Sequence, residues 1–429
     1  MADQITNYKC PACSGPLHFD AKSGMMKCDY CDSQYSVQEI EERYAEADAA
    51  AAEAKAQEDS KQREEDDWAV TSAQWNGEGM KSYGCPSCGA TLVCDDNMAA
   101  SSCPYCGNPT IVPGQFTQML KPDYVIPFKH EKDAALQALK KHYGKRYLLP
   151  QAFKNSSHLD EIKGVYVPFW LYDGKSTGDC TYEAIKEEKK TVGDEEVITK
   201  KYYHVERRGS LEFNKIPADA SSKMDDDMMD SIEPYNYDEL KPFSKAYLTG
   251  YLADKYDVSA QDDAKRAISR AKQSTKDALR DDVKGYDSVS ATRENIHVEQ
   301  GKAYYAMLPV WMLTTRWNGQ SFTFAMNGQT GKMVGDLPIN KPKLWITVLI
   351  VIAAIIGLGI GAFKWATSGA VIAGLVVGLI VYMVLVGGMR SVKAARTANV
   401  YIDESKTKIT HRVDDFVRQE TEKRKINKG

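Results

Sequence analysis

The stretch NYKCPACSGPLHFDAKSGMMKCDYCDS at residues 7–33 recurs as SYGCPSCGATLVCDDNMAASSCPYCGN at residues 82–108. Four cysteines, the proline after the first of them, a leucine and an aspartate coincide at a constant offset of 75 residues. Self-similarity of this kind indicates an internal duplication. The N-terminal part of the chain is therefore predicted to contain two copies of one small structural unit.

Each copy has the cysteine spacing Cys-x2-Cys-x14-Cys-x2-Cys. Two thiolates in one tight turn can share a metal ion, and the fourteen intervening residues can form a β-hairpin that brings the second pair opposite. Four thiolates then close a tetrahedral zinc site with bonds of about 2.3 Å, which leaves no open position for a substrate. The predicted ligands of two structural Zn²⁺ ions are Cys10, Cys13, Cys28 and Cys31 in the first ribbon and Cys85, Cys88, Cys103 and Cys106 in the second.

The N-terminal residues MADQITNYKC lack the apolar segment of a secretory signal peptide, so we expect reduced thiols in the cytoplasm. Disulfides, a redox Cys-x-x-Cys motif and iron–sulfur ligation remain alternative interpretations of the pairs. Cys94 aligns with Phe19 in the duplication, so we interpret it as a buried apolar residue. Cys180 is isolated, and His18 lies in a hairpin that already has four thiolate ligands.

An acidic segment separates the two ribbons. Residues 39–67 contain twelve acidic and four basic side chains, with few apolar residues at heptad spacing. The alanine and glutamate content favours a solvated helix of about 40 Å at 1.5 Å per residue, whereas the high charge also fits a disordered tether. We expect the ribbons to reach into the cytosol on this acidic segment.

Residues 115–340 have the pattern of a mixed α/β region. The predicted helices are Lys132–Tyr147 and Ala260–Val283, and the predicted strands are Gly164–Tyr172, Val197–Arg207, Ser288–Glu299, Tyr304–Trp317 and Ser321–Phe324. Asn327-Gly328 and Thr330-Gly331 favour hairpin turns, because Asn and Gly accept positive φ. VPFWL at residues 167–171 resembles LPVWM at residues 308–312, and each follows a predicted helix. This weaker repeat is compatible with two related α+β halves.

Two apolar runs follow this region. Leu344–Phe363 has twenty residues without a charge, and Ala370–Val386 has seventeen and extends to Met389. Twenty helical residues span about 30 Å, the hydrocarbon thickness of a bilayer. The six-residue connection requires an antiparallel hairpin. Basic residues flank its outer ends, whereas the connection carries only Lys364, so the positive-inside rule places both termini in the cytoplasm.

Composition and motifs narrow the range of functions. The net charge is −4 and the pI about 6.1, and neither ribbon has an excess of basic residues, which disfavours nucleic-acid binding. Phosphate-binding loops, Gly-x-Ser-x-Gly and His-Glu-x-x-His are missing from the sequence. The acidic stretch Asp225–Asp227 with Asp230 fits a solvated loop or, alternatively, a calcium site. The apolar runs contain no ionisable residue, which disfavours ion transport.

The combined layout of CPxC ribbons, VPFWLYD and LPVWML segments, the NGQTGKMVGDLP turn at residues 327–338, two apolar helices and a basic tail resembles a family of bacterial membrane proteins with TFIIB-type zinc ribbons. Only the eight zinc cysteines carry over as functional positions. Some relatives belong to phage-shock-type envelope-stress operons, which also encode a PspA-like coiled coil and a flotillin-like SPFH protein. The resemblance implies a membrane docking platform for such cytosolic partners. Some members are described as replication-restart helicases, but this sequence lacks a helicase's nucleotide loop.

These observations predict a multidomain α+β protein. Its expected parts are zinc ribbon 1 (1–36), the acidic linker (37–79), zinc ribbon 2 (80–114), a mixed α/β cytosolic domain (115–340), a transmembrane hairpin (341–389, with helices 344–363 and 370–389) and a basic cytosolic tail (390–429). We expect a non-enzymatic scaffold that crosses the bacterial inner membrane twice and recruits protein partners, with oligomerisation left open. The alternatives are a membrane-tethered nucleic-acid-binding protein and an enzyme with an unrecognised site in residues 115–340.

Overall fold

The computed structural model describes most of the 429 residues of the chain. The described residues are 10–13, 15–40, 68–75, 80–95, 102–108, 111–114, 119–144, 146–150, 162–192, 195–361, 367–389 and 391–425. Most of the predicted acidic helix lies outside these residues. Its first turn, residues 37–40, is helical.

The chain forms an α+β structure in which long strands dominate. The helices are α2 (Lys132–Gly144), α4 (Asp226–Ile232), α5 (Ala260–Asp281), α6 (Lys341–Gly361) and α7 (Thr367–Gly387), with 3-10 turns η2 (Tyr237–Glu239), η3 (Lys245–Leu248), η4 (Asn399–Tyr401) and η5 (Glu404–Lys406). The strands are β1 (Leu17–Asp20), β2 (Met25–Cys28), β3 (Gln34–Tyr35), β4 (Ala69–Val70), β5 (Gln74–Trp75), β6 (Met80–Gly84), β7 (Thr91–Asp95), β8 (Val112–Gly114), β9 (Met119–Leu120), β10 (Tyr124–Val125), β11 (Lys163–Val192), β12 (Glu195–Asp219), β13 (Lys241–Pro242), β14 (Leu252–Asp254), β15 (Ser288–Trp317), β16 (Gln320–Asn327), β17 (Met333–Gly335) and β18 (Lys408–Lys425).

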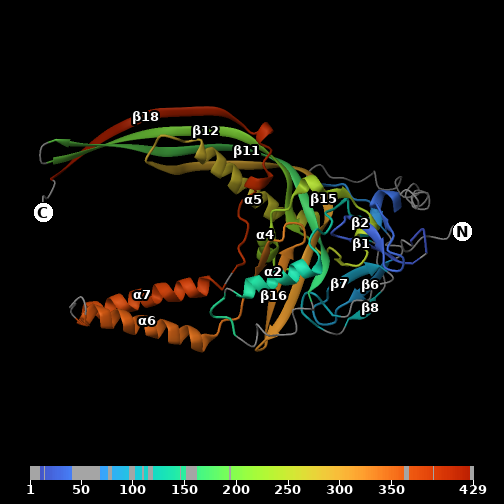
Figure 1. Ribbon diagram of the computed structural model, residues 1–429. Helices are drawn as coiled ribbons and strands as arrows, with labels where there is room; N and C mark the ends of the chain where they lie inside the picture. Colours follow the sequence, from blue (N-terminus) through green and yellow to red (C-terminus); the bar gives the residue numbers. More distant parts are fainter. Residues whose placement is uncertain are drawn as a thin grey trace.

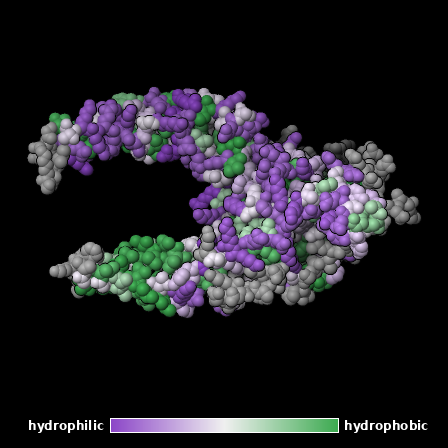
Figure 2. All heavy atoms as spheres, viewed as in Figure 1, coloured by the Kyte–Doolittle hydropathy of each residue, from purple (hydrophilic) through white to green (hydrophobic). Residues whose placement is uncertain are grey.

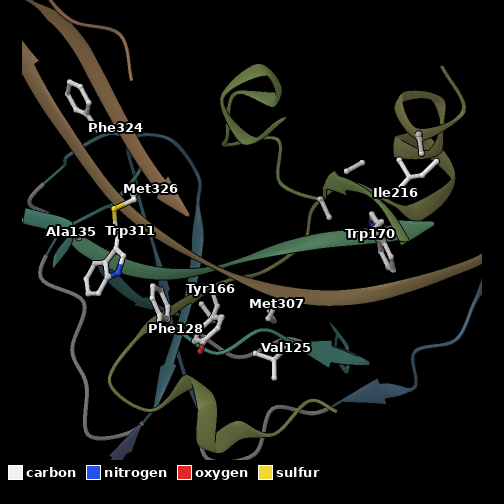
Figure 3. Packing of buried hydrophobic residues seen from close by; sticks show 14 of the residues in the cluster. Val125, Phe128, Ala135, Tyr166, Trp170, Ile216, Met307, Trp311, Phe324 and Met326 are labelled. Atoms are coloured by element: carbon white, nitrogen blue, oxygen red, sulfur yellow. The ribbon is translucent and has the colours of Figure 1, made fainter. Parts of the chain in front are cut away.

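The body of the molecule is built on the antiparallel pair β11 and β15. Successive side chains of a strand point to opposite faces, and here both faces are buried. Tyr166, Trp170 and Trp311 belong to a core that also contains residues of α2 and α5 (Figure 3). Val167 and Phe169 belong to a second core on the other face, shared with α4 and the second ribbon. Burial on both faces explains why VPFWL is apolar throughout.

The weaker sequence repeat lies on these two central strands. VPFWL is on β11 and LPVWM is on β15, with Val167 paired to Leu308. In each half a helix precedes a long hairpin, since α2 comes before β11 and β12, and α5 comes before β15 and β16. This arrangement is compatible with two related halves.

Strand β15 joins two strands that the sequence predicted separately, Ser288–Glu299 and Tyr304–Trp317. Gly301 lies at the junction, next to an irregularity in the pairing between Asp173 and Lys175 of β11. A Cβ atom at Gly301 would lie 2.1 Å from the carbonyl oxygen of Asp173. Glycine therefore allows the strand to continue past the neighbouring backbone, where a larger residue would end it.

A ribbon arm extends from the body (Figure 1). It consists of the distal parts of β11, β12 and β15 together with β18, in the order β15-β11-β12-β18. Helix α5 covers one of its faces, where a Cβ atom at Gly178 would lie 2.5 Å from Leu279. Thr275 of α5 donates a hydrogen bond to Ser176 of β11 at 2.8 Å. Close approach of the helix explains the glycine in the strand.

The predicted basic tail is part of this folded structure as far as Lys425. Residues 391–398, here called the strap, cross α4 and α5 before the chain enters β18. Ala398 N–H donates to Ser274 at 2.7 Å, and Ser231 donates to the carbonyl oxygen of Lys393 at 2.6 Å. Strand β18 then adds to the edge of the arm beside β12. Its mixture of charged residues is consistent with an edge strand that resists aggregation.

A buried ion pair lies beside the strap. Arg270 and Glu233 are 5% and 6% exposed, and the guanidinium donates to both carboxylate oxygens, at 3.0 and 2.6 Å. Tyr401, which follows the strap, donates to the same carboxylate at 2.7 Å. Arg270 also donates to the carbonyl oxygen of Thr397 at 3.2 Å. A buried charge is tolerated only when it is paired in this way, so the strap helps to complete the core.

The buried carboxyl group of Asp263 on α5 is expected to make the stability of the protein depend on pH. Asp263 is 5% exposed, and burial raises the pKa of its carboxyl group from 3.8 to about 7, against the opposing attraction of Arg266. The folded state therefore binds this proton more tightly than the unfolded state does. The contribution of the bound proton to the free energy of unfolding is complete below pH 3.8 and is lost as the pH rises to about 7. Asp263→Asn is therefore expected to make stability depend less on pH, measured as thermal unfolding midpoints at about pH 5 and about pH 8. Asp281→Asn, at an exposed position on the same helix, is the control. Equal pH dependence in Asp263→Asn and the wild type would contradict the assignment.

The two apolar runs form an antiparallel helical hairpin, α6 and α7. The most apolar 18-residue stretch has a mean hydropathy of 2.6 in α6 and 2.7 in α7, and only 17% of each stretch is buried within the protein. Figure 2 shows the hairpin as a hydrophobic projection next to a largely hydrophilic body. Gly374 and Gly378 allow close packing, because a Cβ atom there would lie 2.9 Å from Ile356 or 2.5 Å from Ile352 of α6. Both ends of the hairpin return to the body, where Leu337 N–H donates to the carbonyl oxygen of Met389 at 3.2 Å.

Candidate metal centres

The first group of four predicted ligands comes together at one end of the hairpin β1–β2. The Sγ atoms of Cys10 and Cys31 are 3.5 Å apart, and those of Cys13 and Cys28 are 3.4 Å apart. All four Sγ atoms lie within 4.8 Å of one another. A tetrahedron with bonds of about 2.3 Å has edges of about 3.8 Å, whereas a disulfide requires about 2.05 Å. The spacing therefore fits four thiolates around one metal ion.

The second group has the same arrangement. The Sγ distance is 3.6 Å both between Cys85 and Cys106 and between Cys88 and Cys103, and all four Sγ atoms again lie within 4.8 Å of one another. Each of the eight predicted ligands thus lies where the duplication and spacing placed it. Both groups could hold a metal ion, and the all-thiolate donor set suits zinc.

The backbone of the turns supports this geometry. Cys85 N–H donates to the carbonyl oxygen of Ala90 at 2.9 Å, and Cys103 N–H donates to that of Asn108 at 2.8 Å. Gly89 and Gly107, four residues after these cysteines, have φ values of +72° and +68°. The positive φ closes each turn so that two cysteines point toward one centre, and glycine adopts it without strain.

The turns also favour thiolate in selected cysteines. Burial opposes ionisation of Cys85, but the N–H groups of Cys88 and Ser87 outweigh it and lower the pKa of Cys85 to about 7. The hydrogen bond with Ser33 similarly lowers the pKa of Cys31 to about 6. The neighbouring thiols move the other way, and the pKa is raised to about 12 for Cys13 and to about 11 for Cys88. Each group therefore contains a thiol that loses its proton readily beside one that holds its proton, and thiolate is the form that binds metal.

The other singled-out residues lie outside the two groups. Cys94 is fully buried in the core shared by the second ribbon and the central sheet, as its alignment with Phe19 predicted. Cys180 is also fully buried, beneath α5. His18 Nδ1 lies 3.1 Å from Asp29 Oδ1. These positions agree with structural roles for all three residues.

The second ribbon is part of the central sheet. Its strand β7 pairs with β14, with Val93 opposite Ala253. Thr314 of β15 lies 2.9 Å from the carbonyl oxygens of Pro104 and Tyr105, within the second cysteine turn. The second cysteine group therefore shares a sheet and a hydrophobic core with the body, which the cysteine spacing did not predict.

The first ribbon makes a smaller contact. Its strands form a separate three-stranded sheet, β1-β2-β3. Phe19 packs edge-on against Tyr247 at 5.2 Å between ring centroids, and Ala246 joins the core of the ribbon. Both ribbons thus pack against the body, and the expectation of ribbons that reach into the cytosol on an acidic segment did not include these contacts. The tertiary contacts of Phe19 and Val93 cannot be read from cysteine spacing.

Sequence reasoning also missed a charged cleft of about 820 Å³ beside the strap. Its lining residues include Asp226, Asp230, Arg266, Arg270 and Arg396. The two arginines of α5 that line the cleft are engaged in ion pairs: Arg266 donates to Asp230 at 2.9 Å, and Arg270 donates to Glu233 at 3.0 Å. The acidic stretch that sequence analysis noted serves partly as a helix cap, since Asp225 accepts from the N–H of Met228 at 2.9 Å.

The chain is similar to a curated protein of Bacillus subtilis (strain 168), the uncharacterized protein YdjG. The two sequences are 33% identical over 340 residues, which are 79% of this chain and 92% of the relative. Neither a protein-family model nor a solved structure matches the sequence. The relative carries no assigned activity, so functional inference rests on the geometry described above.

Proposed function

The chain belongs to the family of Bacillus subtilis YdjG, and we propose that it is a non-enzymatic scaffold of the bacterial inner membrane that holds two structural Zn²⁺ ions and recruits cytosolic proteins. The observation that carries the proposal is an apolar hairpin with little protein cover, joined to a polar body with two four-cysteine groups. The resemblance to TFIIB-type zinc-ribbon membrane proteins supports an envelope-stress role, with a PspA-like coiled coil and a flotillin-like protein as partners.

Exposed apolar side chains support insertion of the hairpin. Leu349, Leu375 and Leu379 are 60%, 56% and 58% exposed, and surfaces of this kind are unfavourable in water. Lys341 and Lys343 lie at the end of α6 that is next to the body. The positive-inside rule then favours the body and both termini in the cytoplasm, where thiols stay reduced.

An exposed aromatic side chain supports recruitment through the first ribbon. Tyr30 lies between the ligands Cys28 and Cys31 and is 77% exposed. Tyrosine is enriched among residues that dominate protein–protein binding energy. A structural metal ion would hold this turn, and with it the tyrosine, in one conformation.

Affinity purification from solubilised membranes tests the recruitment. The wild type is expected to retrieve the PspA-like and flotillin-like proteins, while Cys10→Ser and Tyr30→Ala retrieve less of them. Phe416→Ala is the matched control, because Phe416 is also an exposed aromatic residue, at 56%, but lies on the ribbon arm. Undiminished retrieval of both partners by Cys10→Ser and by Cys85→Ser would sink the proposal.

The nucleic-acid alternative requires a free basic surface on the ribbons. In the described part of the first ribbon, Lys27 lies 3.2 Å from Asp32, and Lys22 lies 4.0 Å from Glu131 of the body. These pairings favour the scaffold. Steeply salt-dependent binding of DNA or RNA by the full chain would instead favour the alternative.

A further inference from the structure

Residues Arg146 and Tyr147, in the loop that follows α2, lie beside the first turns of the apolar helix α6. Lys343 Nζ donates to the carbonyl oxygen of Tyr147 at 2.8 Å and lies 3.7 Å from the centre of its ring. The Tyr147 hydroxyl is 3.5 Å from Thr347 Oγ1. Tyr147 nevertheless remains 55% exposed. The loop therefore places an aromatic ring from the body alongside the base of the hairpin.

The hairpin has its own aromatic residues at the same level. Trp345 is 56% exposed, and its ring centroid is 5.8 Å from that of Tyr382 on α7. One helical turn rises about 5.4 Å, so Trp345 lies within about one turn of both Lys343 and Thr347. The rings of Tyr147, Trp345 and Tyr382 thus gather at the end of the hairpin next to the body. Aromatic residues with polar groups are enriched at the level of lipid headgroups.

Three cationic side chains belong to the same part of the structure as these rings. Lys341 is exposed, Lys343 is half-buried, and Arg146 donates to the carbonyl oxygen of Gly388 at the end of α7. Guanidinium and ammonium groups at this level complement the phosphates of acidic phospholipids. The arrangement of apolar helix, aromatic ring and cation is therefore continuous from the hairpin into the loop of the body.

We propose that the Arg146–Tyr147 loop contacts the membrane in addition to helices α6 and α7. The loop inserts Tyr147 at the headgroup level and, together with Lys341 and Lys343, binds acidic phospholipid. The proposal rests on the proposed membrane insertion of the hairpin. It adds that the hairpin is not the only part of the chain that attaches the body to the membrane. The loop fixes the level of the body relative to the bilayer, because it is bonded to both α6 and α7 near their ends.

The test uses the full chain with a genetically incorporated spin-label side chain, which leaves the cysteines untouched. The label is placed at position 147, at position 133 on the opposite end of α2, or at position 379 in the hairpin. Each protein is reconstituted in phosphatidylcholine bilayers with and without phosphatidylglycerol. Accessibility to oxygen, relative to a water-soluble relaxation reagent, then reports the depth of each label. We expect position 147 to lie between the aqueous position 133 and the hydrocarbon position 379, and to shift deeper when phosphatidylglycerol is present.

Two variants test the cationic groups. Arg146→Gln together with Lys343→Gln is expected to abolish the phosphatidylglycerol-dependent shift at position 147, whereas Lys272→Gln, at an exposed position on α5, is expected to retain it. Aqueous accessibility at position 147 with position 379 in hydrocarbon would overturn the contact and leave the anchored scaffold intact. Aqueous accessibility at position 379 would overturn the proposed membrane insertion itself. A shift that survives in the double variant would overturn acidic-lipid binding by these residues.

Discussion

Cys103→Ser is expected to remove one of two bound metal ions and to destabilise the central sheet together with the second ribbon. Structural zinc contributes about 10–16 kcal/mol of apparent binding free energy in small zinc units. The second ribbon shares its core and its strand pairing with the body, through Val93 and Ala253 and through Thr314. Cys10→Ser is also expected to remove one ion, but with a local effect, because the first ribbon forms a separate sheet.

Metal content and hydrogen exchange measure these effects. The metal-to-protein ratio should fall from about two to about one in both variants, and protection of β11 and β14 should fall only in Cys103→Ser. Cys94→Ala is the control, since Cys94 is a buried cysteine of the same ribbon outside the metal group. A ratio that stays unchanged, or equal loss of protection in the central sheet for both variants, would contradict the assignment.

In a lipid bilayer, the outer end of the ribbon arm is expected to lie farther from the hairpin than it does in the structure. Figure 1 shows the arm and the hairpin extending from the same side of the body. The arm is mostly hydrophilic, as Figure 2 shows. Within the described residues β18 pairs only with β12, so its outer edge carries unpaired backbone groups. Charged strands with an open edge cannot enter hydrocarbon, so an arm beside an inserted hairpin has to bend away.

The bend is expected beyond the part of the arm that α5 covers. Leu279 and Val283 belong to one buried cluster with Cys180, Tyr182 and Ala184, and helix α5 ends at Asp281. The strand pairing shifts register twice near this level, between Thr181 and Tyr182 of β11 and, about three residues farther out, between Tyr202 and Tyr203 of β12. Irregularities of this kind bend a strand locally. The contacts between the hairpin and the body can then remain as they are.

Pulsed electron paramagnetic resonance in bilayers tests this expectation. Labels at positions 192 and 372 report the distance between the end of the arm and the hairpin, which should exceed the distance in the structure. Labels at positions 272 and 372 form the control pair, because α5 is anchored in the body, and their distance should match the structure. An unchanged distance for the first pair, or a hydrocarbon environment at position 192, would contradict the bend.

Local patterns in the sequence determined the two four-cysteine groups and the two apolar helices. A Cys-x2-Cys pair lies within one turn, so its spacing restricts the relative positions of the two thiols whatever fold the rest of the chain adopts. The predicted helices Leu344–Phe363 and Ala370–Met389 correspond to α6 and α7, which begin three residues earlier and end two residues earlier than predicted. Both features depend on residues close together in the chain, which is why sequence reasoning reached them.

The apolar run Leu92–Cys94 is a sequence signal for burial on both faces of the strand, which the cysteine spacing does not contain. All three side chains are buried, whereas the matching strand in the first ribbon alternates between buried and half-buried residues. A strand that is apolar on both faces indicates burial on both faces. This difference distinguishes the ribbon that is built into the sheet from the one that rests on it.

The sequence by itself specified the cysteine groups, the hairpin and the principal helices, because these depend on spacing and composition within short segments. Only the tertiary structure decided that the second ribbon joins the central sheet, that the C-terminal tail becomes strand β18 and that Tyr147 lies beside α6. Each of these contacts joins residues far apart in the chain. Their partners are selected by competition among many burial surfaces and strand edges, and local periodicity carries no information about which one prevails.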